Sequence, residues 1–117
     1  MDQSQFEAVV RDAMERLPEW VREALHNIDI LVVDECDEQL YPEAQDLLGL
    51  YVGVPLTERG ANDAGELPDV IYIFRRPHLE LNLPPQELRD EIVRTLIHEI
   101  AHYFGIDDDH LDEIGWA

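Results

Sequence analysis

The longest regular pattern in the sequence lies between a proline pair, Pro84 and Pro85, and Gly105. Between them, apolar residues recur every three or four positions and charged residues fill the gaps, as in a helix with one buried face. Proline suits the first position of a helix, and glycine suits the left-handed residue that ends one. The pattern therefore predicts one long helix that ends at Gly105. Its expected core stripe is Leu88, Ile92, Val93, Leu96, Ile97, Ile100 and Phe104.

The segments before this helix are shorter and alternate in type. Helical spacing predicts a helix over residues 3–17 and a second over Pro18–Leu25, in which Trp20, Val21 and Leu25 are the expected core residues. Runs rich in β-branched and aromatic residues predict strands at 28–33, 47–54 and 69–74, with a polar loop at 57–67. A short acidic helix is expected after Gly105. This order predicts a single α+β domain over residues 1–117, with a small mixed sheet of three to four strands.

Charge and composition narrow the classes of partner. The chain has 27 Asp and Glu residues against eight Arg and no Lys, so its net charge is −19. Such a chain repels phosphate backbones and anionic lipids, which predicts no nucleic-acid or membrane partner. No apolar run approaches the roughly 20 residues of a membrane span, and the acidic start MDQSQFEAVV does not resemble a secretory signal. With the single cysteine Cys36 interpreted as a small residue at a strand end, a cytoplasmic location is expected.

The long helix carries the pattern HExxH, formed by His98, Glu99 and His102. Residues four apart stand one above the other on the same helix face, so both imidazoles can reach one zinc ion. Glu99 lies one step around the helix, near enough to act as a base on metal-bound water without being a ligand. The pattern predicts a zinc site in which His98 and His102 are ligands and Glu99 is catalytic.

A third ligand is expected just beyond the helix. Gly105 allows the chain to turn back there, and a dense set of donor side chains follows: Asp107, Asp108, Asp109, His110, Asp112 and Glu113. Some of these acids have a plain alternative role in capping the last helix, which we assign to Asp109 and Asp112. From residue type and position alone, the third donor stays open among the others.

From His98 to Asp108 the sequence reads HExxHxxGxxD, which is similar to the metzincin-like zinc metallopeptidases. Together with LLGLYVGVPLTERG, the segment HEIAHYFGIDDDHLDEIGW resembles the small bacterial minimal zincins. The resemblance implies a compact α+β domain whose metal helix lies along a small sheet. It also implies a Zn²⁺ held by His98, His102 and Asp108, with Glu99 as general base and a peptide or protein as substrate.

The sequence departs from the larger relatives of this group in two ways. They mostly place a histidine where Asp108 stands and follow it with a Met-turn, whereas the methionines here are Met1 and Met14. With seven residues after His110, we also expect no second lobe of the kind that walls their substrate cleft. His110 and Glu113 therefore remain alternative third ligands.

The sequence favours peptide hydrolysis over two alternatives. One is a metal-binding or interaction module with little turnover; the other is an endoribonuclease of the rRNA-maturation type, which the charge and Glu99 oppose. A peptide is expected to add to a strand near Leu50–Val54. Four polar residues are possible stabilisers of the oxyanion, although each has an ordinary structural interpretation: Tyr72, Arg76, His78 and Tyr103. Substrate identity and oligomeric state are not fixed by any of these features.

Overall fold

The structure of the protein is a computed structural model, and it describes residues 1–39, 41–42, 47–55 and 69–106. Its elements, in chain order, are α1 (Gln3–Glu15), α2 (Glu19–Ala24), β1 (Ile28–Val33), β2 (Gly49–Val52), β3 (Asp69–Phe74), α3 (Arg75–Leu79) and α4 (Pro85–Phe104). Apart from α3, each had been predicted close to these bounds. The strands at 28–33 and 69–74 agree with the prediction residue for residue. The loop expected at 57–67 and the last acidic helix lie outside the described residues.

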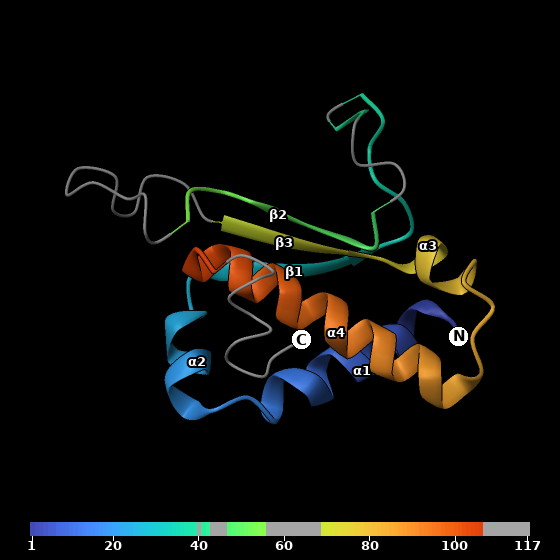
Figure 1. Cartoon of the computed structure of the whole chain (residues 1–117), viewed down its shortest axis with the longest axis horizontal. Coiled ribbons are helices and arrows are strands. Elements are labelled where there is room, and N and C mark those ends of the chain that lie inside the picture. The colour runs from blue at the N-terminus through green and yellow to red at the C-terminus, as the bar shows by residue number, and fades with distance from the viewer. Residues whose placement is uncertain (40, 43–46, 56–68, 107–117) are drawn as a thin grey trace.

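The described strands form one mixed sheet in the order β1-β3-β2. β3 is central: it runs parallel to β1 and antiparallel to β2. The helices α1, α2 and α4 lie on one side of the sheet, and α4 runs along it (Figure 1). The predicted α+β class with a small mixed sheet is therefore confirmed.

The core fills the space between the sheet and these helices. Its buried members come from α1, α2, β3 and α4: Phe6, Val10, Ala13, Val21, Leu25, Ile71, Ile73, Leu88, Ile92, Leu96, Ile100 and Tyr103. Most of the predicted stripe of α4 is buried here, while Val93, Ile97 and Phe104 are half-buried. Trp20, expected in the core, is 60% exposed. That expectation was wrong because α2 is short: its inward side buries Val21, and the chain then buries Leu25 at the C-cap of the helix.

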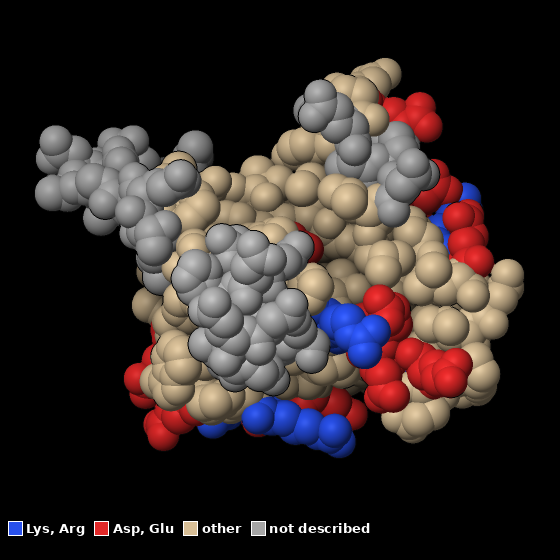
Figure 2. All heavy atoms as spheres, viewed as in Figure 1, with Lys and Arg blue, Asp and Glu red and all other residues tan. Residues whose placement is uncertain are grey.

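The two ends of α4 follow the predicted signals. Pro84 is the N-cap and Pro85 the first helical residue. Gly105 adopts the left-handed conformation, with φ 77° and ψ 22°, and its N–H bonds back to the carbonyls of Ala101 and His102. The helix is thus fixed in length and ends just after the second histidine. Figure 2 shows Asp and Glu side chains at several separate places around one face of the molecule, with Arg side chains beside some of them.

Replacement of Leu96 by alanine tests this core. Leu96 is fully buried between α4 and its neighbours. We expect Leu96→Ala to lower the free energy of unfolding by about 2–5 kcal/mol, because the cavity left behind collapses only in part. Urea denaturation of the metal-free protein measures this change. Leu81→Ala, at a position that is 43% exposed, is the matched control and should change the stability by less than about 0.5 kcal/mol.

Candidate metal centre

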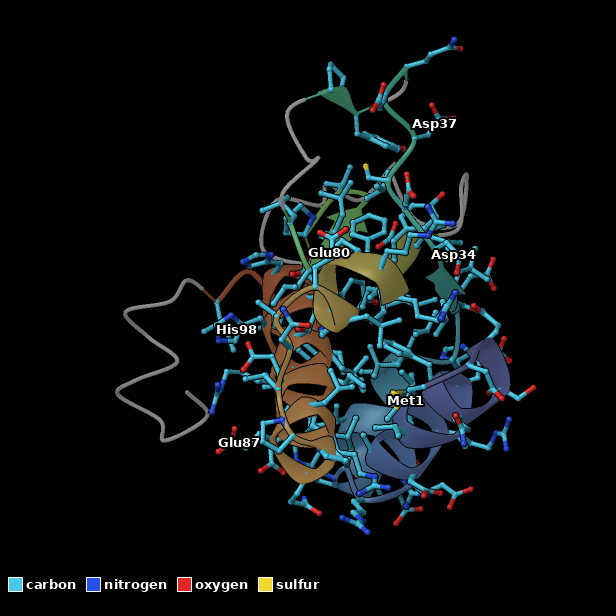
Figure 3. The ribbon with its side chains drawn as sticks, turned by 90° about the vertical axis from the view of Figure 1, so that its right-hand side faces the viewer. Met1, Asp34, Asp37, Glu80, Glu87 and His98 are labelled. Carbon is cyan, nitrogen blue, oxygen red and sulfur yellow. The ribbon has the colours of Figure 1, made fainter. Side chains whose placement is uncertain are left out.

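The two histidines and the glutamate of HExxH lie on α4 with different degrees of exposure. The side chain of His102 is 45% exposed, His98 is half-buried, and Glu99 as a whole is only 8% exposed. Figure 3 shows His98 on the side of α4 that faces away from α1. Two imidazoles one helical turn apart beside a carboxylate are a donor set that fits zinc. The described part of the site therefore offers two candidate ligands on one face of the helix.

A hydrogen bond links Glu99 to the second histidine. Nδ1 of His102 lies 3.2 Å from Oε1 of Glu99. An ionised carboxylate can only accept, so this contact favours the tautomer in which Nδ1 carries the proton. The lone pair of Nε2 is then directed away from Glu99. A neutral imidazole in this tautomer is the form that ligates a metal through Nε2.

Strand β2 passes directly over the helix at Glu99. A Cβ built on Gly49 would lie 2.7 Å from Cγ2 of Thr95, 3.0 Å from the carbonyl oxygen of Tyr72 and 3.2 Å from Cγ of Glu99. No side chain fits at this position, so the backbone of β2 rests on the helix. Neither Gly49 nor Thr95 was identified from the sequence as part of the site. A glycine inside a predicted strand was the available signal, since it often marks a close backbone approach.

The third ligand cannot be located among these residues. Asp108, the favoured candidate, lies outside the described residues, as do Asp107, His110 and Glu113. Within residues 1–39, 41–42, 47–55 and 69–106, no three His, Cys, Asp or Glu side chains form a group that could hold a metal. A third donor beside His98 and His102 would therefore come from residues outside these ranges, which include Asp108.

The residues considered for the oxyanion have structural partners. Tyr103 packs in the core and its hydroxyl donates to the carbonyl of Ala24 at 3.3 Å. Tyr72 stacks with Phe74 in a small cluster around Cys36, outside the main core. Arg76 forms an ion pair with Glu35. These contacts favour the structural interpretation of each residue.

His78, the fourth of them, lies in α3 and is fully buried. Its Nδ1 is 2.7 Å from the carbonyl oxygen of Phe74, and its Nε2 is 2.9 Å from the hydroxyl oxygen of Thr95. Burial lowers the pKa of His78, although the Phe74 carbonyl and Glu91 act in the opposite direction. The ring is therefore held neutral, with its proton on Nδ1.

This lowered pKa has a consequence for stability. The ordinary pKa of a histidine is 6.5. As the pH falls below this value, the imidazole of the unfolded chain takes up a proton, whereas the buried imidazole of the folded protein is still neutral. The free energy of unfolding of the wild type should then decrease, at most by about 1.4 kcal/mol per pH unit, relative to a His78→Phe variant. Above this range the difference between the two proteins should be constant. Urea denaturation at a series of pH values measures it, and a flat difference at low pH would contradict the assignment.

Cys36 follows β1 and is buried, as expected for a small structural residue. Burial, together with the nearby charge of Asp37, raises the pKa of its thiol. A raised pKa disfavours the thiolate, which is the nucleophilic form. The site on α4 is therefore the stronger candidate for catalysis.

Comparison with known proteins assigns the chain to a group. The family described as zincin-like metallopeptidase matches residues 25–116. The match begins near the end of α2 and takes in the whole sheet and α4, so it includes every residue of the candidate site. No curated protein matches the sequence significantly. In the part of the chain that the structure describes, no helix has the length and apolar character needed to cross a membrane.

Proposed function

The chain belongs to the zincin-like metallopeptidase family, and from that premise we propose that it is a zinc-dependent peptidase. His98, His102 and Asp108 would hold the metal, and Glu99 would be the general base. The observation that carries the proposal is the position of Glu99, which is nearly buried beneath β2 while its carboxylate contacts the exposed His102. A structural zinc site, closed by four protein ligands, needs no such carboxylate.

When bound, zinc supplies a Lewis acid that polarises the scissile carbonyl and lowers the pKa of water. Glu99 accepts a proton from the attacking water and passes it to the leaving amine. The contact with Gly49 on one side and with Nδ1 of His102 on the other restricts the carboxylate to a small range of positions. Such restriction is what a general base needs if it is to be in place before the substrate arrives.

Strand β2 is the proposed support for an extended peptide. Its one partner among the described residues is β3. The N–H of Phe74 donates to the carbonyl of Leu48 at 2.9 Å, and along an antiparallel strand successive residues direct their backbone groups alternately toward and away from the partner. The N–H and C=O of Gly49 are therefore directed toward the opposite edge. A peptide added there would pass next to Glu99.

The proposed substrate is a peptide or protein, with no role for nucleic acid or membrane. The net charge of −19 opposes both of these, and it favours substrates that are neutral or basic. The proposed location is the cytoplasm.

The test is cleavage of a peptide library by the zinc-loaded protein, followed by mass spectrometry. We expect cleavage products that disappear when a chelator removes the metal and return when zinc is added back. Metal analysis of the same sample confirms that zinc was present. A protein that retains zinc and cleaves no peptide would contradict the peptidase and support the alternative, a metal-binding module with little or no turnover.

A further inference from the structure

His78 is enclosed by three parts of the fold. It lies in α3, its Nδ1 donates to the last residue of β3, and its Nε2 bonds to the side chain of Thr95 on α4. The ring of Phe6 from α1 packs against it edge to face, with ring centroids 5.3 Å apart. A histidine with both nitrogens bonded and no exposed surface is fixed in place. His78 therefore gives Thr95 a partner that does not move.

Thr95 is held from two sides. On one side its hydroxyl oxygen is 2.9 Å from Nε2 of His78, and on the other its methyl group lies against the backbone of Gly49. The hydroxyl is also 3.0 Å from the carbonyl of Glu91, but its single proton can serve only one acceptor at a time. With His78 neutral, that proton bonds to Nε2. The gap between the methyl group of Thr95 and β2 is narrow, since a Cβ added on Gly49 would lie only 2.7 Å from that methyl group.

Glu99 follows Thr95 by one helical turn on the same face and touches the same part of β2. A hydrogen bond lets two heavy atoms approach to about 2.9 Å, whereas carbon atoms in contact stay about 3.5–4.0 Å apart. Loss of the His78–Thr95 bond would therefore push Thr95 away from α3 and against β2. Because Thr95 and Glu99 belong to one rigid helix, Glu99 and the two histidines would move with it.

We propose that His78 is a positioning residue of the metal centre, which acts through the hydroxyl of Thr95 to set the place of α4 against β2. The inference rests on the proposed function for the reaction that Glu99 carries out. His78 itself touches neither metal nor substrate in this proposal.

Four variants separate positioning from stability: Thr95→Val, His78→Phe, the double variant and Thr95→Ser. Each single apolar substitution removes the hydrogen bond between the two side chains. Thr95→Val leaves Nε2 of His78 without a donor, and His78→Phe removes the donor to the Phe74 carbonyl, so both the Tm and kcat should fall. The double variant contains neither Nε2 of His78 nor the hydroxyl of Thr95, so only the Phe74 carbonyl has lost a donor, and the Tm should recover in part relative to Thr95→Val. Its kcat should stay about 10- to 100-fold below wild type with KM little changed, because the side chains at positions 78 and 95 still lie farther apart than the hydrogen-bonded pair.

Thr95→Ser should have the opposite combination of effects on the Tm and kcat to the double variant. Serine keeps the hydroxyl and loses the methyl group, so the Tm should fall while kcat stays within about threefold of wild type. His26→Gln, at an exposed histidine on the surface, is the matched control and should change neither quantity. The absorption spectrum of the Co²⁺-substituted protein reports the geometry of the ligands without any turnover. We expect it to shift in the double variant and to match the wild type in Thr95→Ser.

The proposal is overturned if the double variant has both the wild-type Co²⁺ spectrum and the wild-type kcat. It is also overturned if kcat follows the Tm through all four variants, since His78 would then be only a structural residue. A wild type that binds metal but cleaves no peptide would contradict the proposed function alone. In that case the Co²⁺ spectra still decide whether His78 positions the helix.

Discussion

Glu99→Gln is expected to lower kcat by about 10²- to 10⁴-fold while zinc affinity stays near the wild-type value. Glutamine keeps the size of the side chain and can still bond to Nδ1 of His102, but it cannot accept a proton from water. Glu99 is not expected to be a ligand, so the metal should remain. Peptide cleavage by the zinc-loaded variant, together with its metal content and affinity, measures both parts of the expectation.

Glu87→Gln is the matched control for this substitution. It makes the same change of charge at an exposed position near the start of the same helix. It should leave kcat unchanged, and both variants should have nearly the wild-type Tm. A Glu99→Gln variant that loses zinc would make Glu99 a ligand, and one that keeps full activity would remove it from the mechanism.

The strongest sequence signals were those that depend on local structure alone. The long helix has a proline at its start, a glycine at its end and an apolar stripe between them, and the structure places it at Pro85–Phe104. The strand Asp69–Phe74 is a continuous β-rich run, as expected for the central strand of a sheet. HExxH also depends only on helical spacing. These features could be read without knowledge of which elements pack together.

The features that were missed depend on contacts between distant residues. RRPHL follows the strand at 69–74 and no element was predicted for it, yet it forms the short helix α3. His78 is stabilised there by Phe74 and Thr95, and the partnership with Thr95 spans 17 residues of sequence. Trp20 has helical spacing that suits the core, but its ring packs at the surface against Phe104, with centroids 5.8 Å apart. A pattern of residue types along the sequence does not show which distant residues are in contact.

Gly49 belongs to a strand that the local sequence pattern predicted, but its role depends on contacts with distant residues. The sequence indicated only an interrupted strand at 47–54. In the structure the missing side chain lets β2 rest on Thr95 and Glu99, so the sheet edge and the HExxH helix meet at one point. The edge proposed to hold a peptide and the residue proposed to act on it are therefore adjacent for a steric reason.

Asp108→Ala is expected to weaken zinc binding by more than about 100-fold. Residues that only support a ligand contribute about 10- to 100-fold to metal affinity, so a ligand itself should contribute more. His98 and His102 would remain, and two imidazoles alone leave the metal open to water and to chelators. Competition with a chromophoric chelator measures the affinity. The metal-free stability should change little, so a loss of affinity would reflect the donor and not the fold.

The acidic run around Asp108 supplies its own controls. Asp109→Ala removes the same charge one residue away, so both variants change the long-range field on zinc equally and differ only in the donor that is lost. Asp109→Ala should keep nearly the wild-type affinity. His110→Ala and Glu113→Ala test the two alternative ligands, and a large loss in either one with a small loss in Asp108→Ala would replace Asp108 in the site. Zinc accepts imidazole nitrogen as well as carboxylate oxygen, so Asp108→His should bind zinc more tightly than Asp108→Ala if Asp108 is the ligand, and the two variants should have the same affinity if it is not.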